Sequence, residues 1–216
     1  MDHLKNHIGQ LREDFMKGTL SETEVNKNPF VQFEQWLQQA VDARIPEVQA
    51  MNLATVSADL KPASRTVYLR EFDNHCFCFY TNYQSAKARH LDQNPNAALT
   101  FFWPELERQI RIEGVVEKVS EQQSDSYFKS RPYDSKIGAW ASRQSNPLTS
   151  RDELDQKIND FKMMFTPESI MRPEYWGGYQ VIANYYEFWQ GRKNRLHDRI
   201  VYRQQNGEWI ISRIAP

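Results

Sequence analysis

Residues that could carry chemistry gather near the end of the chain, in the segment E-F-W-Q-G-R-K-N-R-L-H-D-R from Glu187 to Arg199. Its last five residues place Arg195, His197 and Arg199 at alternate positions. If the segment is a strand, these three side chains share one face and Asp198 lies on the other. Such a cationic face would suit an anionic, planar ligand, and histidine is the side chain whose pKa lies nearest neutrality.

The same alternation has a purely structural interpretation. Charged side chains on an edge strand discourage aggregation, so the cations could equally mark a solvated sheet edge. The histidine and the aromatic pair Phe188 and Trp189, directly upstream, favour a binding site. Spacing alone leaves both interpretations open.

Further groups that could bind anions occur earlier in the chain. Arg65 and Arg70 fall within a predicted strand. Lys87 follows Ser85 in the first turn of a predicted helix, where free backbone N–H groups and the helix dipole favour phosphate. Each of these cations alone is typical of an ordinary protein surface.

The fourth group is Tyr127, Arg131 and Ser135, in which hydroxyl groups flank an arginine at four residues on each side. This spacing could encircle a phosphate with a charge-assisted fork, or could simply be a helix end. Glycine-rich phosphate loops and a nucleophile-elbow serine are absent from the sequence, which argues against ATP, classical dinucleotides and serine hydrolysis. A phosphorylated aromatic ligand, or two of them, would suit this set.

Composition limits the class of protein. The 216 residues contain 27 Lys and Arg against 28 Asp and Glu, so a coat for nucleic acid or acidic membrane is not expected. No apolar run of about 18 residues exists, and the start of the chain is polar, which predicts a cytoplasmic protein. Cys76 and Cys78 are expected as reduced core residues, and the five histidines show no metal-ligand spacing.

The elements that must position these groups are mostly strands. Asn28-Pro29 predicts a helix start, and helices are also expected at 85–93 and after Ser120 and Ser150. A less regular stretch is expected at 131–147, and Asn206-Gly207 predicts a hairpin. The predicted strands are 51–57, 64–71, 76–81, 97–103, 109–119, 176–183, 185–190, 195–203 and 209–214.

This order favours a mostly β fold with flanking helices (α+β), in which short turns join the strands into an antiparallel sheet or barrel. Residues 1–28 are expected to form a polar helical or mobile segment, a possible lid. Residues 29–216 are expected to form a single domain with helical insertions at about 120–165.

Several blocks of the chain, from about Leu11 to its end, resemble one family. They are R-T-V-Y-L-R from Arg65, F-Y-T-N from Phe79, L-E-R-Q from Leu106, S-R-P-Y-D-S-K-I-G-A-W from Ser130, R-Q-S from Arg143, F-W-Q-G, R-L-H-D-R and the terminal I-A-P. In this order they are similar to the pyridoxine/pyridoxamine 5′-phosphate oxidases. The resemblance implies an FMN-binding split β-barrel that works as a homodimer, with two flavins at the subunit interface.

The resemblance also implies roles for individual residues. FMN would be bound by Arg65, Thr66, Val67, Tyr68, Leu69, Arg70, Tyr80, Thr81, Lys87, Gln109, Gln144, Ser145, Trp189 and Arg199, some of them from the second subunit. Substrate would be bound by Arg12, Arg70, Tyr127, Arg131, Ser135, Arg195 and His197, of which Arg195 and His197 would be catalytic.

The implied activity is that of a pyridoxal 5′-phosphate synthase, in which O₂ oxidises pyridoxamine or pyridoxine 5′-phosphate with release of hydrogen peroxide, and of ammonia from the amine. The sequence departs from the family pattern at Arg70, where lysine is usual, at Ala86, where arginine is common, and at Phe15, where tyrosine is expected in the lid. Two alternatives stay open: a flavin or pyridoxal-phosphate carrier without catalysis, and a split-barrel flavoenzyme with another substrate.

Overall fold

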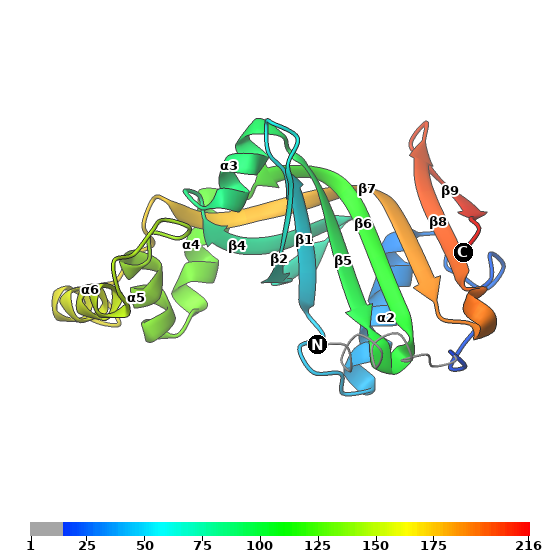
Figure 1. Ribbon diagram of the computed structural model, residues 1–216, viewed down its shortest axis with the longest axis horizontal. Helices are drawn as coiled ribbons and strands as arrows, with labels where there is room; N and C mark the ends of the chain where they lie inside the picture. The colour runs from blue at the N-terminus through cyan, green and yellow to red at the C-terminus, as the bar shows by residue number, and fades with distance from the viewer. Residues whose placement is uncertain (1–14) are drawn as a thin grey trace, which may run out of the picture. The chain divides into compact units, whose positions relative to one another are not determined.

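The computed structural model describes residues 15–216. Arg12 and most of the predicted N-terminal helix lie outside this range. The helices are α2 (Pro29–Asp42), α3 (Ala86–Gln93), α4 (Glu121–Ser130), α5 (Tyr133–Ala141) and α6 (Arg151–Met164). The strands are β1 (Ala50–Val56), β2 (Pro62–Tyr68), β3 (Glu71–Asp73), β4 (Cys76–Asn82), β5 (Asn96–Trp103), β6 (Arg108–Lys118), β7 (Trp176–Gln190), β8 (Asp198–Gln205) and β9 (Glu208–Arg213), and all of them but β3 are labelled in Figure 1.

The strands form one sheet in the order β2-β1-β5-β6-β7-β4-β3, with β8 paired to β7 and β9 paired to β8. The pairs β1–β2, β3–β4, β4–β7, β7–β8 and β8–β9 are antiparallel. Asn206 and Gly207 both have positive φ, as a tight β8–β9 hairpin requires, which confirms the predicted turn. The prediction of a mostly β, antiparallel fold with flanking helices is therefore confirmed.

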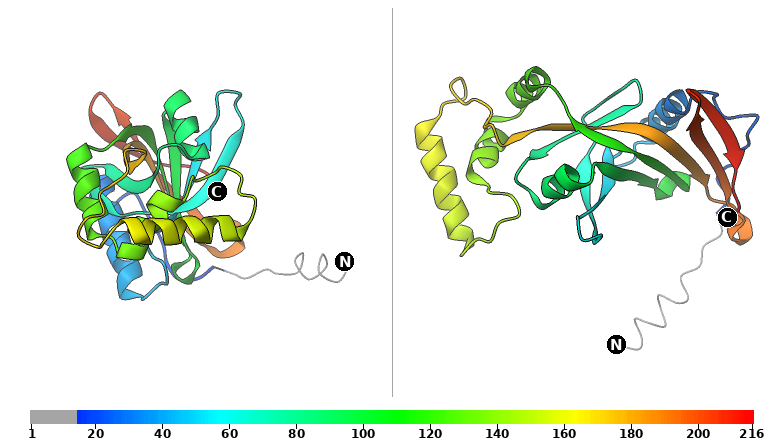
Figure 2. Two further views of the ribbon diagram at one scale, coloured as in Figure 1. Left: turned by 90° about the vertical axis from the view of Figure 1, so that its left-hand side faces the viewer. Right: turned by 90° about the horizontal axis from the view of Figure 1, so that it is seen from above.

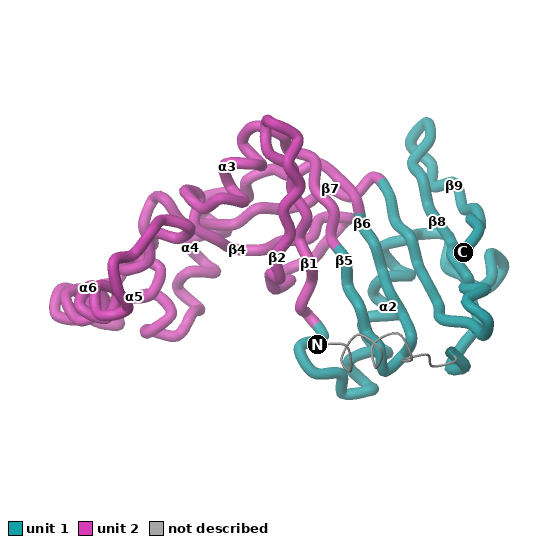
Figure 3. The backbone as a smooth tube through the Cα atoms, viewed as in Figure 1, with its two compact units in different colours: residues 1–48, 100–112, 185–216 teal, residues 49–99, 113–184 magenta. Residues whose placement is uncertain are grey.

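The chain divides into two compact units that interleave along the sequence, as Figure 3 shows in two colours. The described part of unit 1 is residues 15–48, 100–112 and 185–216, and unit 2 is residues 49–99 and 113–184. The division into units does not test whether residues 29–216 form a single domain, so that expectation stays a prediction. No helix in residues 15–216 is long and apolar enough to span a bilayer.

Unit 1 packs α2 against its strands. The Asn28 side chain accepts a hydrogen bond from Phe30 N (2.9 Å), which confirms the predicted cap. The apolar stripe predicted on this helix is buried: Phe33 packs on Phe101, and the Trp36 ring meets Phe188 edge-on at 5.2 Å. This core supports β7 and β8, the two strands on either side of the turn in which the R-L-H-D-R segment begins.

Unit 2 has a strand core and a helical core. The helical core is built from Phe128, Ile137, Ala139, Ile170 and Trp176. The stretch expected to be irregular contains helix α5. The sequence did not predict this helix because its N-cap residue is Pro132, whose side chain cannot form a capping hydrogen bond. Figure 2 shows α6 lying alongside α5.

Candidate functional site

Unit 2 contains a cavity of about 940 Å³ in which most of the predicted site residues meet. It is of the size that proteins use for small ligands and cofactors. The predicted residues that line it are Arg65, Thr66, Val67, Tyr68, Arg70, Tyr80, Thr81, Lys87, Tyr127, Arg131, Ser135, Gln144 and Ser145. Ala86, Ser130, Pro132 and Trp176 complete the wall and were absent from the predicted set.

Lys87 is the buried cation of this cavity, with only 8% of its surface exposed. Its Nζ donates to Thr81 Oγ1 (3.0 Å), Ser85 Oγ (3.3 Å) and Gln144 Oε1 (2.9 Å), all of them neutral acceptors. Burial, followed by repulsion from Arg65, lowers the pKa of Lys87 to about 8. A buried cation that only neutral groups contact would be stabilised by an anionic ligand.

Arg65 lies on β2 beside this lysine. Its Nη1 donates to Leu53 O (3.0 Å) and Thr55 Oγ1 (2.8 Å), so its acceptors are also neutral. Burial lowers its pKa. Neither Arg65 nor Lys87 forms an ion pair with a carboxylate among residues 15–216.

The loop after α5 closes onto the start of α3. Ser145, with a left-handed φ of 69°, accepts a hydrogen bond from Ala86 N (3.1 Å). Gln144 Oε1 accepts one from Thr81 Oγ1 (2.9 Å). The Ser85 side chain makes no capping bond. The Ala86 N–H group, which was expected to be free for phosphate, instead donates to Ser145, about 60 positions away in the sequence.

A stack of aromatic rings forms another part of the wall. The Tyr80 and Tyr127 rings lie 3.7 Å apart and nearly parallel, and Trp176 is nearly parallel to Tyr127 at 6.2 Å. Tyr80 OH donates to Glu71 Oε1 (2.7 Å). Gly178 makes room for the stack because a Cβ there would lie 2.8 Å from the Tyr80 ring.

Arg131 lies against this stack, with its guanidinium 4.5 Å from the Trp176 ring centroid. Its Nη1 is buried and has no hydrogen-bond partner among residues 15–216. Burial lowers its pKa, and Arg70 acts in the same direction. An unsatisfied buried donor is costly, so this atom is suited to receive an oxygen atom of a ligand. Arg131 is the C-cap of α4, which ends at Ser130, and Pro132 follows as the N-cap of α5.

The remaining predicted site residues do not line the cavity. Leu69 is buried in unit 2. Gln109 is on β6, Trp189 is on β7 and Arg199 is on β8, all in unit 1 together with Arg195 and His197. Arg12 lies outside the described residues.

The predicted strand face at Arg195 and His197 is wrong. A short 3₁₀ turn covers Lys193–Arg195, and β8 begins only at Asp198. Asn194 and Arg195 have left-handed φ values of 57° and 61°, which break the alternation that a strand requires. Arg195 is exposed at the tip of this turn.

His197 lies among aromatic rings. Its ring centroid is 4.6 Å from Trp189 and 5.3 Å from Phe15, which it meets edge-on. Its Nδ1 accepts a hydrogen bond from Arg192 N (3.1 Å). Burial, followed by repulsion from Arg195, lowers its pKa.

Arg199 is held by a carboxylate. Its Nε donates to Glu187 Oε1 (2.8 Å) and its Nη1 to Ala215 O (3.0 Å). Arg111 Nη1 donates to the second oxygen of the same carboxylate (2.9 Å), and Glu187 is 2% exposed. Glu187 and Arg199 are diagonal neighbours on β7 and β8, since Trp189 pairs with Arg199 in the register.

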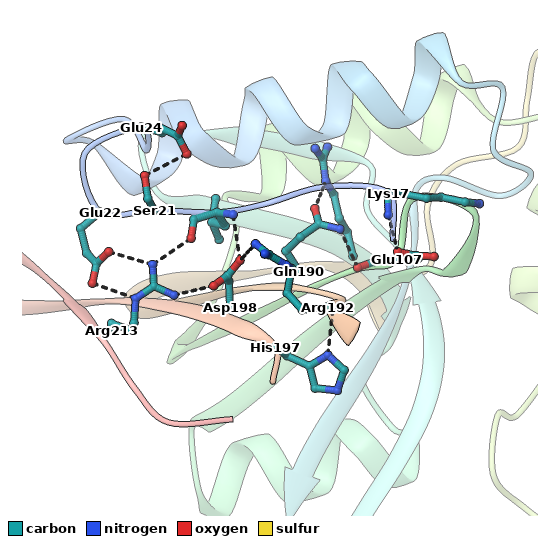
Figure 4. A network of polar contacts seen from close by, with 12 residues as sticks. Lys17, Ser21, Glu22, Glu24, Glu107, Gln190, Arg192, His197, Asp198 and Arg213 are labelled. Carbon is teal, nitrogen blue, oxygen red and sulfur yellow. Dashed lines mark hydrogen bonds and ion pairs between the residues drawn. The ribbon is translucent and has the colours of Figure 1, made fainter. Parts of the chain in front are cut away.

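Asp198 also pairs with arginines. Its carboxylate accepts from Arg192 Nη1 (2.8 Å), Arg213 Nη1 (2.6 Å) and Leu20 N (3.1 Å), as Figure 4 shows. These contacts lower its pKa against the opposing effect of burial. Asp198 is therefore a structural partner of the neighbouring arginines.

The antiparallel sheet with flanking helices places this chain in the split β-barrel fold class. Residues 37–165 match the family model described as "Pyridoxamine 5′-phosphate oxidase", and residues 176–216 match the "Pyridoxine 5′-phosphate oxidase C-terminal dimerisation region". The chain therefore belongs to the pyridoxamine 5′-phosphate oxidase family.

Individual relatives agree with this assignment. The chain is 51% identical to a pyridoxine/pyridoxamine 5′-phosphate oxidase of Acaryochloris marina, over 100% of this chain and 99% of that protein. It is 50% identical to the Bordetella pertussis protein of the same name, over 97% and 99%. Among solved structures, PhzG from Burkholderia lata in complex with tetrahydrophenazine-1-carboxylic acid matches with a TM-score of 0.86 and 26% identity, over 92% of this chain and 98% of that one.

Proposed function

We propose that this protein binds FMN and oxidises pyridoxamine 5′-phosphate and pyridoxine 5′-phosphate to pyridoxal 5′-phosphate. The observation that carries the proposal is the arrangement of cations in the cavity. Lys87 lies near Arg65, and Arg131 lies near Arg70. None of the four forms an ion pair with a carboxylate among residues 15–216. Two phosphate-bearing molecules, cofactor and substrate, account for two such pairs.

The residues around Lys87 fit the phosphate of FMN. The buried ammonium has three neutral acceptors and a lowered pKa, so a dianionic group would compensate a charge that the protein leaves without a counter-ion. Arg65 adds a second cation, while Gln144 and Ser145 line the same cavity. FMN here agrees with the family and with an FMN-binding relative of the same fold.

The residues around Arg131 fit the substrate phosphate. Its buried Nη1 lacks a hydrogen-bond partner in the part of the chain that the structure describes, and Tyr127 and Ser135 contribute hydroxyl groups to the same cavity wall. Arg70, exposed beside the Tyr68 ring, adds a second cation. With arginine at 70, this chain offers the substrate a planar guanidinium in place of the family's usual ammonium, a change that favours two-pronged contact with phosphate oxygens.

The reaction converts the CH₂–NH₂ group of the amine, O₂ and water into an aldehyde, ammonia and hydrogen peroxide; the alcohol substrate gives the aldehyde and hydrogen peroxide. When bound, FMN supplies the two-electron acceptor that O₂ can reoxidise. The protein binds both phosphates and stacks the two rings so that the reacting atoms meet. Arg195 orients the pyridine ring, and His197 forms a hydrogen bond near the 4′ substituent.

The proposal includes a homodimer, which the match to a dimerisation region supports. In the dimer, Gln109, Trp189, Arg195, His197 and Arg199 of one subunit complete a cavity together with residues of the other. The ion pair between Arg199 and Glu187 was not predicted from the sequence, and it changes the role proposed for Arg199. This cation reaches the flavin already partly neutralised, so its main effect is on binding geometry.

The test is to purify the protein, record its flavin absorption spectrum, and measure pyridoxal 5′-phosphate formation from pyridoxamine 5′-phosphate in air. We expect a yellow protein that forms the aldehyde and hydrogen peroxide in equal amounts. A yellow protein without turnover would instead support the carrier function. A colourless protein that stays inactive after addition of FMN would overturn the proposal.

A further inference from the structure

The turn that precedes β8 brings the ring of His197 back onto its own backbone. The N–H group of Arg192 points at Nδ1 of His197 across 3.1 Å. A backbone amide can only donate, so the ring atom that faces it must be a nitrogen with a free lone pair. The proton of the neutral ring is then on Nε2.

The same contact disfavours the imidazolium form. A protonated ring would carry hydrogen on both nitrogens, and the one on Nδ1 would be directed at the Arg192 N–H group. The charged groups that face the ring act in both directions: Arg195 lowers the pKa of His197 and Asp198 raises it, while burial has the largest effect and lowers it. The neutral ring is therefore favoured.

Asp198 holds Arg192 in the place that this contact requires. One of its carboxylate oxygens accepts from Arg192 Nη1 (2.8 Å) and from Leu20 N (3.1 Å), and the other accepts from Arg213 Nη1 (2.6 Å). The carboxylate is 15% exposed and its pKa is lowered, so it remains ionised. Figure 4 shows Arg192 between Asp198 and the His197 ring.

Phe15 packs on the other side of this turn. Its ring meets both Trp189 (5.6 Å) and His197 (5.3 Å) edge-on. Position 191 is a glycine because a Cβ there would lie 2.7 Å from Phe15 Cδ1. The backbone N–H groups of Met16 and Lys17, the residues that follow Phe15, both donate to Glu107 Oε2 (2.7 and 2.8 Å). The His197 ring is thus held at Nδ1 and along its edges.

We infer that Arg192 and Asp198 are positioning residues that lock His197 in its neutral Nε2–H tautomer, so that His197 presents a hydrogen-bond donor to the substrate and not a base. This inference rests on the proposed function only in the identity of the substrate. It implies that the proton released from the 4′ amine or hydroxyl passes to a group other than His197. Its partner on the substrate is an oxygen or nitrogen with a lone pair.

The tautomer can be measured without substrate. A two-bond ¹H–¹⁵N correlation spectrum of the full-length protein, labelled with ¹⁵N-histidine, distinguishes the two nitrogens of each ring. The signals of His197 among the five histidines are identified by their loss in His197→Asn. We expect a bare Nδ1 and a protonated Nε2 at neutral pH. An Nδ1–H tautomer or an imidazolium would overturn the inference, whether or not the protein oxidises pyridoxamine 5′-phosphate.

The role of Asp198 is tested with Asp198→Asn against the matched control Glu22→Gln. Both Asp198 and Glu22 accept hydrogen bonds from Arg213, but Glu22 has no hydrogen bond to Arg192. In Asp198→Asn we expect the His197 spectrum to show mixed tautomers and kcat to fall about tenfold. In Glu22→Gln the His197 spectrum and kcat should both stay as in the unchanged protein.

Arg192→Gln, which removes the same ion pair from the other side, replaces Asp198→Asn if that variant does not fold. An unchanged spectrum and kcat in the folded variant would refute the positioning role.

Substitution of His197 itself tests donor against base. The amide nitrogen of glutamine reaches about as far as Nε2 and donates, whereas that of asparagine is shorter and lies nearer to Nδ1. We expect His197→Gln to retain at least about tenfold more kcat than His197→Asn, the value of one hydrogen bond to a reacting group. Equal loss in both variants would contradict the donor role. If the wild-type protein has no oxidase activity at all, the proposed function fails and the tautomer measurement still stands.

Discussion

The cations that line the cavity of unit 2 and the arginines around β7 and β8 in unit 1 differ in what surrounds them. Within the described residues, Lys87 and Arg65 of unit 2 donate only to neutral oxygens, and Arg131 has a buried nitrogen without a hydrogen-bond partner. In unit 1, Arg199 shares Glu187 with Arg111. Arg192 and Arg213 likewise share Asp198. Among residues 15–216, the cavity of unit 2 therefore contains positive charge without carboxylate partners, whereas these arginines of unit 1 are neutralised by carboxylates.

This difference suggests two roles for the cations: those without a carboxylate partner bind anionic ligands, and those paired with a carboxylate position the surrounding residues. A buried cation that lacks a counter-ion lowers the stability of the free protein and gains most when an anion arrives. A cation paired with a carboxylate gains less from a ligand, but it holds backbone and rings in one geometry. The substitutions that follow should therefore affect stability in unit 1 and ligand affinity in unit 2.

The largest effect is expected at Glu187. Glu187→Gln keeps the shape of the side chain but removes the negative charge that Arg111 and Arg199 both contact, at a position that is 2% exposed. Because both arginines keep some contact with solvent, we expect the free energy of unfolding to fall by about 2–3 kcal/mol, below the range for a fully buried pair. Urea denaturation monitored by fluorescence measures it.

The matched control for this change is Glu208→Gln, at the exposed start of β9. Its free energy of unfolding should change by less than about 0.5 kcal/mol. Equal losses in the two variants would show that Glu187 is not the centre of a structural ion pair, and the contrast between the units would weaken.

Lys87→Met, in contrast to Glu187→Gln, should affect ligand affinity and not lower stability. It removes a desolvated charge, so stability should be unchanged or higher, while the affinity for FMN should fall about 30- to 100-fold through loss of a charge-assisted hydrogen bond. Quenching of FMN fluorescence on binding gives the affinity. Lys129→Met on the exposed face of α4 is the control and should leave the affinity unchanged. Retention of FMN affinity in Lys87→Met would remove the phosphate site from this part of the cavity.

Arg131→Met tests whether the two cationic pairs of unit 2 serve different ligands. We expect the KM for pyridoxamine 5′-phosphate to rise about 10- to 30-fold, since one charge-assisted hydrogen bond to the substrate phosphate is lost. The affinity for FMN should change by less than about twofold because the two sites are separate. Steady-state kinetics at saturating FMN, with Arg89→Met as the surface control, measure the first quantity. A parallel loss of FMN affinity would mean that both pairs bind one molecule.

The sequence was sufficient for local features. The cap at Asn28, the Ser120 cap that accepts from Gln123 N (3.1 Å) and the Asn206-Gly207 hairpin all depend on residues within a few positions of each other. Most of the cavity wall was also predicted, through the family resemblance. Trp176 was missed, although its place at the start of a predicted strand was the available signal.

The features that could not be predicted from the sequence depend on contacts between distant residues or on the turn after Gly191. The Ser145 hydroxyl that occupies the start of α3 comes from about 60 residues away. The left-handed turn at Asn194 and Arg195 overrode the alternation that predicted a cationic strand face. The spacing of arginines also does not show which of them are paired, because Glu187 meets Arg199 only through the β7–β8 register.

The smallest expected effect is a pH dependence of cofactor binding. In the free protein the pKa of Lys87 is lowered to about 8, chiefly by burial and then by Arg65. A bound phosphate favours the charged amine and raises this pKa, so above pH 8 binding must take up a proton. The Kd for FMN should therefore be nearly constant below pH 7.5 and rise about tenfold between pH 7.5 and pH 9. Titrations of FMN fluorescence across this range measure it, and Lys87→Met should abolish the slope; an equal slope in that variant would assign the titration to another group.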